Sequence, residues 1–406
     1  MKYTLINETE QLPSVLSAIE AADLLGMDTE FVSEDCYQPD LCLLQISTRD
    51  TVFTVDPRLI PDITPLWQLL VSDNRTVVVH AGREEILFAH RATGRAIPQL
   101  FDIQFAVGLL GGEYPASYGK LLQRYLGISA PKGETRTDWR KRPLSEAQLE
   151  YAALDVLHLP QLFDILTVQL RQAERLNWLQ DEMIRRQSQL IEAQEQEGWS
   201  RLPGLQSLQG KHLAIVRELW LWRDERARTK NMPSRRVLRD DLIVEIAKRG
   251  SADPKKIANI RGLHHSGVQR FLPEIGSCVS RGNRAPVPEA PWMRRSRKPR
   301  PPALLQQFLT AAMSYLCRTN DIAPTIVGTA DDVGKLASYW LDDAKVGPED
   351  EAFPNLLRSW RADLVGNPLY DIFTGRQALR VANPGDEMPL ELCEVEPAVF
   401  PLNSQE

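Results

Sequence analysis

The first 125 residues or so alternate short apolar runs with amphipathic stretches, and this pattern constrains the fold more than any other feature of the chain. Short apolar runs predict β-strands, and the stretches between them predict helices that cover a sheet. Helical periodicity then takes over from Ser145 to about Gln187, where Ser145, Glu146 and Gln148 form a capping sequence. The sequence therefore predicts an α/β domain, with strands at 24–27, 41–46, 51–55 and 76–79.

The rest of the chain divides at segments where the apolar pattern lapses. Such a lapse near Pro203 and Gly204 predicts a domain boundary. A second gap is rich in proline and basic residues, so we expect an extended, positively charged linker there. Its basic residues are Arg294, Arg295, Arg297, Lys298 and Arg300. The expected units are a first domain at 1–195, a helical domain at 205–282, the linker at 283–302, a helical domain at 303–385 and a poorly ordered tail at 386–406.

Charge is unevenly distributed along the chain. The net charge is −6, yet residues 204–302 hold 22 Lys and Arg against 9 Asp and Glu, which leaves −19 for the remainder. A basic island of this kind is either a solvated face or a surface for nucleic acid. Composition alone does not choose between the two.

The composition is that of an ordinary globular protein, with 43% hydrophobic and 25% charged residues. No run approaches the roughly 18 apolar residues of a membrane span, and the first ten residues lack the apolar core of a signal peptide. We therefore expect a cytoplasmic protein without a membrane partner. The five cysteines are scattered without a CxxC pair, and we expect them to be reduced thiols.

Two acidic residues end the first predicted strand. Asp28 and Glu30 are two residues apart, so alternation along a strand points both side chains to the same side. Unpaired acids at the end of an apolar strand are unfavourable unless a cation neutralises them, and oxygen ligands suit a hard divalent metal. The pattern favours a metal site, although a strand end whose acids simply face solvent would give the same residues.

Two further segments carry candidate functional residues. Tyr151 and Asp155 are four residues apart in the helical region and thus share one helix face. That face either contributes to a site or belongs to an amphipathic helix with a core Tyr and an exposed Asp. Glu84 and Glu85 follow the turn at Gly82, where a third acidic ligand could enter. Acids are equally common in the first turn of any helix, where they complement the helix dipole.

Together these segments resemble the DEDD superfamily of 3′–5′ exonucleases, in the branch with a Tyr four residues before the last Asp, and within it the ribonuclease D family. The resemblance covers nearly all of residues 1–170, in order and at family-like spacing. It implies a ribonuclease H-like α/β exonuclease domain with a mixed sheet and flanking helices. The matching segments are Asp28–Phe31, Tyr37, Leu41–Gln45, His80–Gly82, Asp102, Thr137–Trp139, Arg142–Leu144 and Tyr151–Val156.

The resemblance also implies roles for particular residues. Asp28, Glu30 and Asp155 would bind two divalent cations, Mg²⁺ or Mn²⁺, and Tyr151 would position the attacking water. Where the family has an Asp as its fourth acid, this chain has Glu85, which is one methylene longer. Because near-octahedral Mg²⁺ tolerates misplaced ligands poorly, we expect an active enzyme that is metal-selective or slow. By the same resemblance, the residues beside the RNA would be Thr29, Phe31, Gln45 and His80.

The two helical modules also resemble parts of ribonuclease D. Residues 219–228, 231–233 and 253–263 are similar to the helicase and RNase D C-terminal (HRDC) module, a small helical bundle. Residues 303–381 resemble the C-terminal domain of ribonuclease D proteins, so we expect a second, HRDC-like all-α bundle that either packs as a clamp or contacts RNA. The basic side chains expected to neutralise RNA phosphates, unless they are merely solvated, are Arg223, Arg226, Arg228, Lys230, Arg235 and Arg236.

The resemblance implies stepwise hydrolysis of RNA from its 3′ end to 5′-mononucleotides, with tRNA precursors as the main substrate and a monomeric enzyme. A DNA 3′–5′ exonuclease is the nearest alternative enzyme, because it shares the same carboxylates. The HRDC-like modules and the ribonuclease D motifs argue against it. A catalytically weak or silent RNA-binding protein is the alternative from another class, and Glu85 is the residue that leaves it open.

Overall fold

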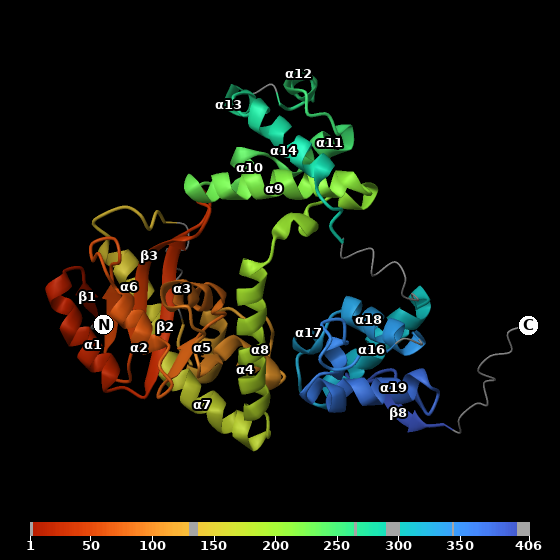
Figure 1. Cartoon of the computed structure of the whole chain (residues 1–406). Helices are drawn as coiled ribbons and strands as arrows, with labels where there is room; N and C mark the ends of the chain where they lie inside the picture. Colours follow the sequence, from red (N-terminus) through yellow and green to blue (C-terminus); the bar gives the residue numbers. More distant parts are fainter. Residues whose placement is uncertain (1–2, 130–136, 264–265, 290–300, 343–344, 396–406) are drawn as a thin grey trace, which may run out of the picture.

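The computed structural model describes residues 3–129, 137–263, 266–289, 301–342 and 345–395 (Figure 1). The strands of the first region are β1 (Thr4–Ile6), β2 (Leu24–Val32), β3 (Asp40–Ser47), β4 (Val52–Val55), β5 (Thr76–Val79) and β6 (Leu100–Asp102). They form one six-stranded mixed sheet with the order β1-β4-β3-β2-β5-β6. The central strand β2 is antiparallel to β3 and parallel to β5, so the expected mixed sheet is confirmed.

The four strands expected from apolar runs are present, and β2 is longer than its apolar run. It continues to Val32 because its polar half is also paired with β3, for example Asp28 with Gln45. The three-residue strands β1 and β6 are not among the expected ones, because three residues are too few to show an alternating pattern.

The second half of β2 forms an edge of the sheet that has no neighbouring strand on one side. β5 pairs with β2 only from Leu24 to Gly26, and within the described residues no other strand pairs with that side of β2. Helix α3 (Arg83–Thr93) begins soon after β5 and contacts β2. The segment of β2 that carries the two acids therefore lies beside the start of a helix.

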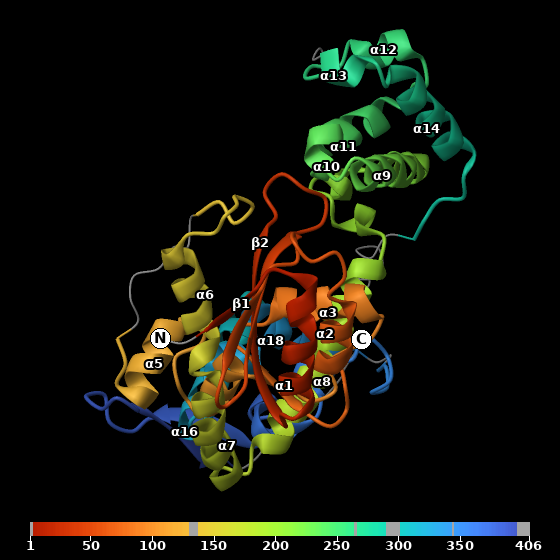
Figure 2. The same ribbon diagram turned by 90° about the vertical axis from the view of Figure 1, so that its left-hand side faces the viewer.

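Helices cover both faces of this sheet (Figure 2). α6 and α7 pack against β2 on one face, whereas α1, α2 and α3 lie on the other side of the sheet. Besides α3, the helices of the first region are α1 (Leu12–Glu20), α2 (Thr64–Leu70), α4 (Ile103–Leu109), α5 (Tyr118–Leu126), α6 (Glu146–Leu157), α7 (Leu159–Gln172) and α8 (Leu176–Glu195). The capping sequence expected for α6 is present, because Ser145 and Gln148 exchange side-chain to backbone hydrogen bonds.

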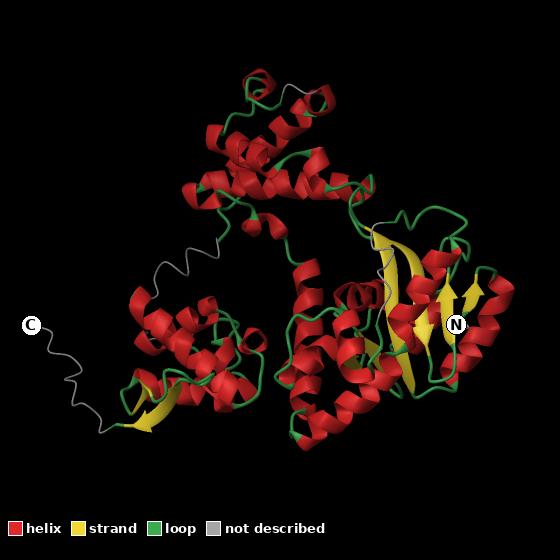
Figure 3. Ribbon diagram, turned by 180° about the vertical axis from the view of Figure 1, so that it is seen from behind, coloured by secondary structure: helices red, strands yellow, loops and turns green. Residues whose placement is uncertain are grey.

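The second region is a helical bundle with a hydrophobic core of its own (Figure 3). Its long first helix, α9 (Lys211–Thr229), packs against α14 (Leu272–Arg284) and α11 (Asp240–Arg249). The shorter helices are α10 (Ser234–Val237), α12 (Pro254–Ala258) and α13 (Ser266–Gln269). The basic residues expected in the linker after this bundle, at 294–300, lie outside the described residues.

The third region packs against the first and shares its hydrophobic core. Its helices are α16 (Ala303–Thr319), α17 (Pro324–Val327), α18 (Ala330–Leu341) and α19 (Asn367–Phe373). Trp178 of α8 stacks on Trp360 with ring centroids 5.1 Å apart, and Ala323 N donates a hydrogen bond to Gly108 O at 2.9 Å. Trp360 is buried, so it packs the interface between regions and is not a platform for a base.

The third region is not entirely helical, which corrects one expectation. β7 (Gln377–Val381), in the domain expected to be all-helical, pairs antiparallel with β8 (Leu390–Glu394), in the segment expected to be a poorly ordered tail. Leu379 and Leu392 are direct partners in this hairpin, and both pack on the hydrophobic core. Strand pairing and this contact order the segment, and neither is visible in five residues of sequence.

None of the helices in the described part of the chain is long and apolar enough to cross a membrane.

Candidate active site

The free edge of β2 presents the first two acids toward helix α6. Gly26, Asp28 and Glu30 alternate onto one side of the strand, and Gly26 lies against Leu159, so this side faces α6 and α7. Asp28 and Glu30 are both half-buried. The expectation that these two side chains share one side of a strand agrees with the register of β2 and β3.

Helix α6 brings the tyrosine and the last acid to the same side of the sheet. It contacts β2, β3 and β4, and Ser47 Oγ of β3 donates a hydrogen bond to Val156 O at 2.7 Å. The ring of Tyr151 packs beside buried Trp139, with centroids 6.3 Å apart. A hydrogen bond joins Tyr151 to Asp155, as expected for residues four apart on one helix face.

A tight turn between β5 and α3 positions the fourth acid, Glu85. Gly82 is required there, because a Cβ atom would lie 2.4 Å from a methyl group of Val79. The carboxylate of Asp102 accepts hydrogen bonds from Ala81 N at 3.2 Å and Gly82 N at 3.3 Å. Asp102 therefore fixes the turn that starts α3.

The carboxylate of Glu85 is bound by Thr29, the residue between the two acids of β2. Thr29 Oγ1 donates to Glu85 Oε1 at 2.5 Å, and both side chains are buried. The charge of Glu85 also raises the pKa of Asp28, so the two carboxyl groups interact electrostatically. Thr29 is only 5% exposed, and its hydroxyl is occupied by the hydrogen bond to Glu85. Its side chain is therefore not free to contact RNA, which corrects that expectation.

Burial raises the pKa of all four carboxyl groups. Burial first, and then the charges of Glu85, Asp155 and Glu30, raise the pKa of Asp28 well above its ordinary range. Burial first, and then the charges of Asp155 and Glu85, raise the pKa of Glu30 to about 8. Burial raises the pKa of Glu85 to about 7 and that of Asp155 to about 6. The four acids thus form one electrostatic cluster that resists carrying four negative charges.

The chemistry of this cluster fits a hard divalent cation. Its donors are carboxylate oxygens, and no salt bridge to a described residue neutralises any of them. The described residues nevertheless contain no three Asp, Glu, His or Cys side chains already arranged around one ion position. One carboxylate oxygen of Glu85 is instead bound by the hydroxyl of Thr29.

Tyr151 remains a phenol at neutral pH. Burial first, and then the charges of Asp155 and Glu30, raise the pKa of Tyr151 above its ordinary value. A group that holds its proton so firmly cannot act as a base. Its hydroxyl can donate and accept hydrogen bonds, which is what orienting a water molecule requires.

Gln45 and His80, which were also expected beside RNA, both lie against other parts of the protein. Gln45 is fully buried opposite Asp28, and neither polar atom of its amide has a hydrogen-bond partner among the described residues. It therefore cannot touch RNA directly, which corrects that expectation. His80 Nε2 lies 2.9 Å from Ala116 O, so one ring nitrogen is engaged by the backbone.

The basic residues of the second region fall into two groups. Arg223 is 4% exposed and bound to Asp240 and to Leu238 O, so it is unavailable to a phosphate, contrary to expectation. Arg226 and Arg228 are paired with Glu274 and Asp224 at 2.7 and 2.9 Å. Of the six basic residues expected to contact phosphates, Lys230, Arg235 and Arg236 are exposed and form no salt bridge to described residues.

Sequence reasoning missed Tyr118, a second tyrosine near the acids. Its ring lies 5.6 Å from the His80 ring, and its hydroxyl is buried. Burial first, and then the charge of Asp155 among others, raise the pKa of Tyr118. A lone Tyr outside any recognised segment gives no signal of this position, because α5 reaches the site only through the fold.

Comparisons with known proteins relate the chain to exonucleases. A family model described as 3′–5′ exonuclease matches residues 3–171, and a model of the HRDC domain matches residues 212–279. The chain is 29% identical over 391 residues to ribonuclease D of Sphingobium indicum, with 94% of this chain and 97% of that protein covered. It is 32% identical over 384 residues to ribonuclease D of Acidiphilium cryptum, with 92% and 94% covered.

A solved structure extends the likeness to all three regions. RNase D of Escherichia coli, described as an exoribonuclease involved in structured RNA processing, matches with a TM-score of 0.78 at 24% identity. The match covers 92% of this chain and 99% of that one. The two chains therefore share a fold from the sheet to the third region.

Proposed function

The chain belongs to the ribonuclease D family, and we propose that it hydrolyses RNA stepwise from the 3′ end, using two divalent cations and releasing 5′-mononucleotides. Relatives named ribonuclease D align over nearly their whole length, which supports an exoribonuclease activity for the entire chain. We further propose that tRNA precursors are the substrate and that the enzyme acts as a cytoplasmic monomer.

The observation that carries this proposal is the meeting of four acids and a tyrosine at the free edge of β2. Asp28 and Glu30 come from β2, Glu85 from α3, and Tyr151 and Asp155 from α6. They are separated by up to 127 residues in the chain, and mutual repulsion makes their approach unfavourable without a cation. Bound cations would relieve this repulsion, so the cluster supports a metal-dependent activity.

The four carboxylates would hold the cations, which when bound acidify water and stabilise the leaving 3′ oxygen of the scissile bond. Tyr151 keeps its proton and is placed to orient the attacking water by a hydrogen bond. Asp155 accepts a hydrogen bond from Tyr151 and so fixes the direction of that hydroxyl. Trp139 packs beside the Tyr151 ring and limits its movement.

The proposal is tested by the products formed from 3′-extended tRNA, from unstructured RNA and from single-stranded DNA. We expect 5′-mononucleotides from RNA in Mg²⁺ or Mn²⁺, none in EDTA, and none with an Asp28→Ala variant. Hydrolysis by Asp28→Ala at the native rate in either metal would refute the assignment of the site. Equal hydrolysis of DNA would instead favour the DNA exonuclease alternative.

One observation favours the alternative of a silent RNA-binding protein. Thr29 holds Glu85, and the described residues contain no assembled group of three metal ligands. This alternative predicts RNA binding without cleavage in both Mg²⁺ and Mn²⁺. The same product assay therefore decides between the two functions.

A further inference from the structure

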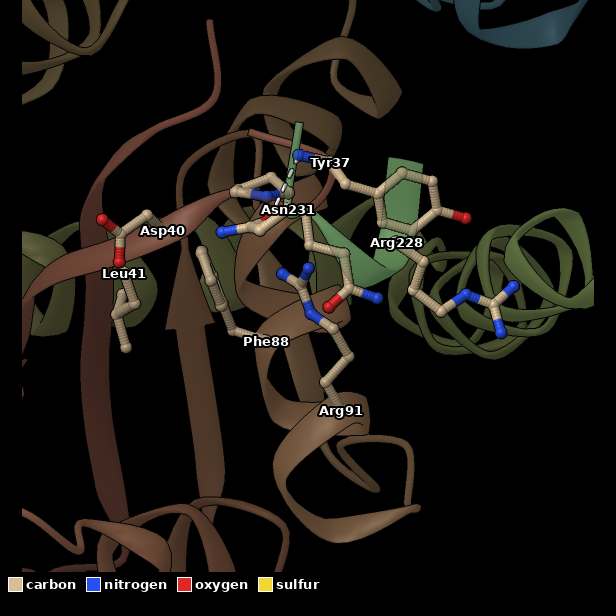
Figure 4. Close-up of a pocket in the computed structure, with 9 residues that line it drawn as sticks. Tyr37, Asp40, Leu41, Phe88, Arg91, Arg228 and Asn231 are labelled. Atoms are coloured by element: carbon tan, nitrogen blue, oxygen red, sulfur yellow. Dashed lines mark hydrogen bonds between the residues drawn. The ribbon is translucent and has the colours of Figure 1, made fainter. Parts of the chain in front are cut away.

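A cavity lies outside the carboxylate cluster, where the first and second regions meet (Figure 4). Its volume is about 470 Å³. The β2–β3 connection, helix α3 and the end of α9 all contribute to its walls. The residues used in the following argument are Tyr37, Leu41, Phe88, Arg91, Arg228 and Asn231.

Specific contacts hold the two regions together around this cavity. Tyr37 Oη donates to Asp224 Oδ1 at 2.8 Å, and Tyr37 N donates to Asn231 Oδ1 at 3.2 Å. Arg228 forms a salt bridge with Asp224 at 2.9 Å, and its guanidinium lies 5.9 Å from the centre of the Tyr37 ring. Arg228 therefore belongs to a wall of defined geometry.

The cavity has one arginine on each of two sides, and one of them, Arg228, also pairs with Asp224. Arg91 and Arg228 are both exposed and line it from opposite regions, and Figure 4 shows their guanidinium groups apart from one another. The one acid among its lining residues is Asp40, which is bound to Arg58 and Arg140, each at 2.9 Å. The cavity thus favours an anion with more than one charged group.

The cavity adjoins the catalytic acids on the side of the second region. Phe88 follows Glu85 by three residues, so both lie on one face of α3. The ring of Phe31, the residue after Glu30, lies 5.8 Å from the Phe88 ring. Arg91 is six residues beyond Glu85, which is about 9 Å along the helix. A polynucleotide whose 3′ end reaches the acids has this cavity within a few nucleotides.

We propose that this cavity is a subsite for RNA upstream of the scissile bond, in which Arg91 and Arg228 neutralise separate phosphates. The wall formed by Tyr37 and Leu41 offers half-buried apolar surface against which a base can pack. This inference rests on the proposed function and deepens it, because the second region then adds affinity only for RNA long enough to reach the cavity.

The test compares a diribonucleotide with a longer single-stranded oligoribonucleotide. Arg91→Gln and Arg228→Gln should each raise KM for the longer RNA about tenfold, the loss of one charge-assisted hydrogen bond, with kcat unchanged. Both variants should hydrolyse the diribonucleotide like the native protein. The salt dependence of binding to the longer RNA, measured by fluorescence anisotropy in EDTA, should become less steep with each substitution.

Matched controls remove similar charges elsewhere. Arg249→Gln breaks an exposed pair with Glu245 that has the same four-residue spacing as Arg228 and Asp224. Arg95→Gln removes an exposed, paired guanidinium of the first region. Neither residue lines the cavity, so neither variant should change the preference for the longer RNA. Arg228→Lys should retain part of that preference, because it keeps the charge.

Two results would overturn the subsite. One is an equal loss on the diribonucleotide and the longer RNA, which indicates a structural role for the two arginines. The other is unchanged KM and unchanged binding of the longer RNA in both variants. A native protein that binds RNA but cleaves none refutes the proposed function alone, because the binding measurements still test the subsite.

Discussion

Thr29 Oγ1 donates a hydrogen bond to Glu85 Oε1 at 2.5 Å, across 56 positions of the chain. This bond ties the acid that departs from the family pattern to the strand that carries the two central acids. Glu85 is one methylene longer than the Asp of the family pattern, and its carboxylate accepts a hydrogen bond from the Thr29 hydroxyl. We therefore expect the metal preference of the enzyme to depend on how readily Glu85 leaves Thr29.

We expect Glu85→Asp to raise the ratio of Mg²⁺-supported to Mn²⁺-supported activity by about tenfold, a difference of about 1.4 kcal/mol in transition-state stabilisation. The shorter side chain has less reach toward Thr29, and Mg²⁺ demands ligands close to octahedral positions. The measurement is kcat on one oligoribonucleotide in each metal. An unchanged ratio would show that Glu85 does not limit the choice of metal.

Thr29→Val should destabilise the metal-free protein by about 1–3 kcal/mol, because a buried carboxyl loses its donor. Thr29→Ser keeps the hydroxyl and should be close to the native protein. Urea denaturation in EDTA measures both. Addition of Mg²⁺ should recover more stability in Thr29→Val than in the native protein, since Glu85 is then free to bind the cation. Equal stability of the two variants would contradict this role of Thr29.

The stability of the metal-free protein should fall as pH rises from about 5 to about 8. Glu30 has a pKa of about 8 in the folded protein against an ordinary value of 4.5, so the folded state binds more protons than the unfolded state between these values. Deprotonation then favours unfolding. Tm measured in EDTA at both pH values checks the direction.

Glu30→Gln supplies the control for this pH dependence, because an amide at position 30 does not titrate. Its Tm should fall less between the two pH values than that of the native protein. Mg²⁺ should also raise the native Tm more at pH 8 than at pH 5, since the cation binds the deprotonated carboxylates. A native Tm that rises with pH in EDTA is incompatible with the raised pKa values.

The sequence predicted the features of the fold and the site that depend on residues close together in the chain. Alternation placed Asp28 and Glu30 on one side of a strand, and the spacing of Ser145 and Gln148 predicted the start of α6. Both depend on neighbours within a few residues. The departure at Glu85 was also evident, because it is a change of residue type within a recognised motif.

Contacts between distant segments could not be predicted in this way. Thr29 lies between the two acids of β2, and Gln45 pairs with Asp28 from the neighbouring strand, yet both side chains are buried. Arg223 is one of several arginines on α9, and only the packing of the bundle buries it against Asp240. In each case the partner is set by the tertiary fold, which a run of residues does not specify.

Tyr151→Phe should lower kcat by about 10²-fold while KM for RNA changes little. The substitution removes the hydroxyl that would orient water and keeps the ring that packs beside Trp139. Because the pKa of Tyr151 is raised, its titration should not appear in the pH–rate profile of the native enzyme below pH 10. A large loss of RNA affinity in Tyr151→Phe would instead indicate a structural residue.

Arg361→Met should destabilise the protein by about 1–3 kcal/mol, because the buried carboxylate of Glu182 loses one of its two arginine partners and keeps only Arg185. Arg361 lies in the third region and binds Glu182 of α8 at 2.7 Å, and its guanidinium also donates to Val327 O and Ile326 O. The side chains of Arg361 and Glu182 are each 3% exposed, so solvent cannot replace the lost interaction. Urea denaturation followed by tryptophan fluorescence reports on this interface directly, since Trp178 and Trp360 stack across it. The double variant Arg361→Met with Glu182→Gln removes both charges and should recover part of the loss; a double variant less stable than Arg361→Met would show that the ion pair does not account for it.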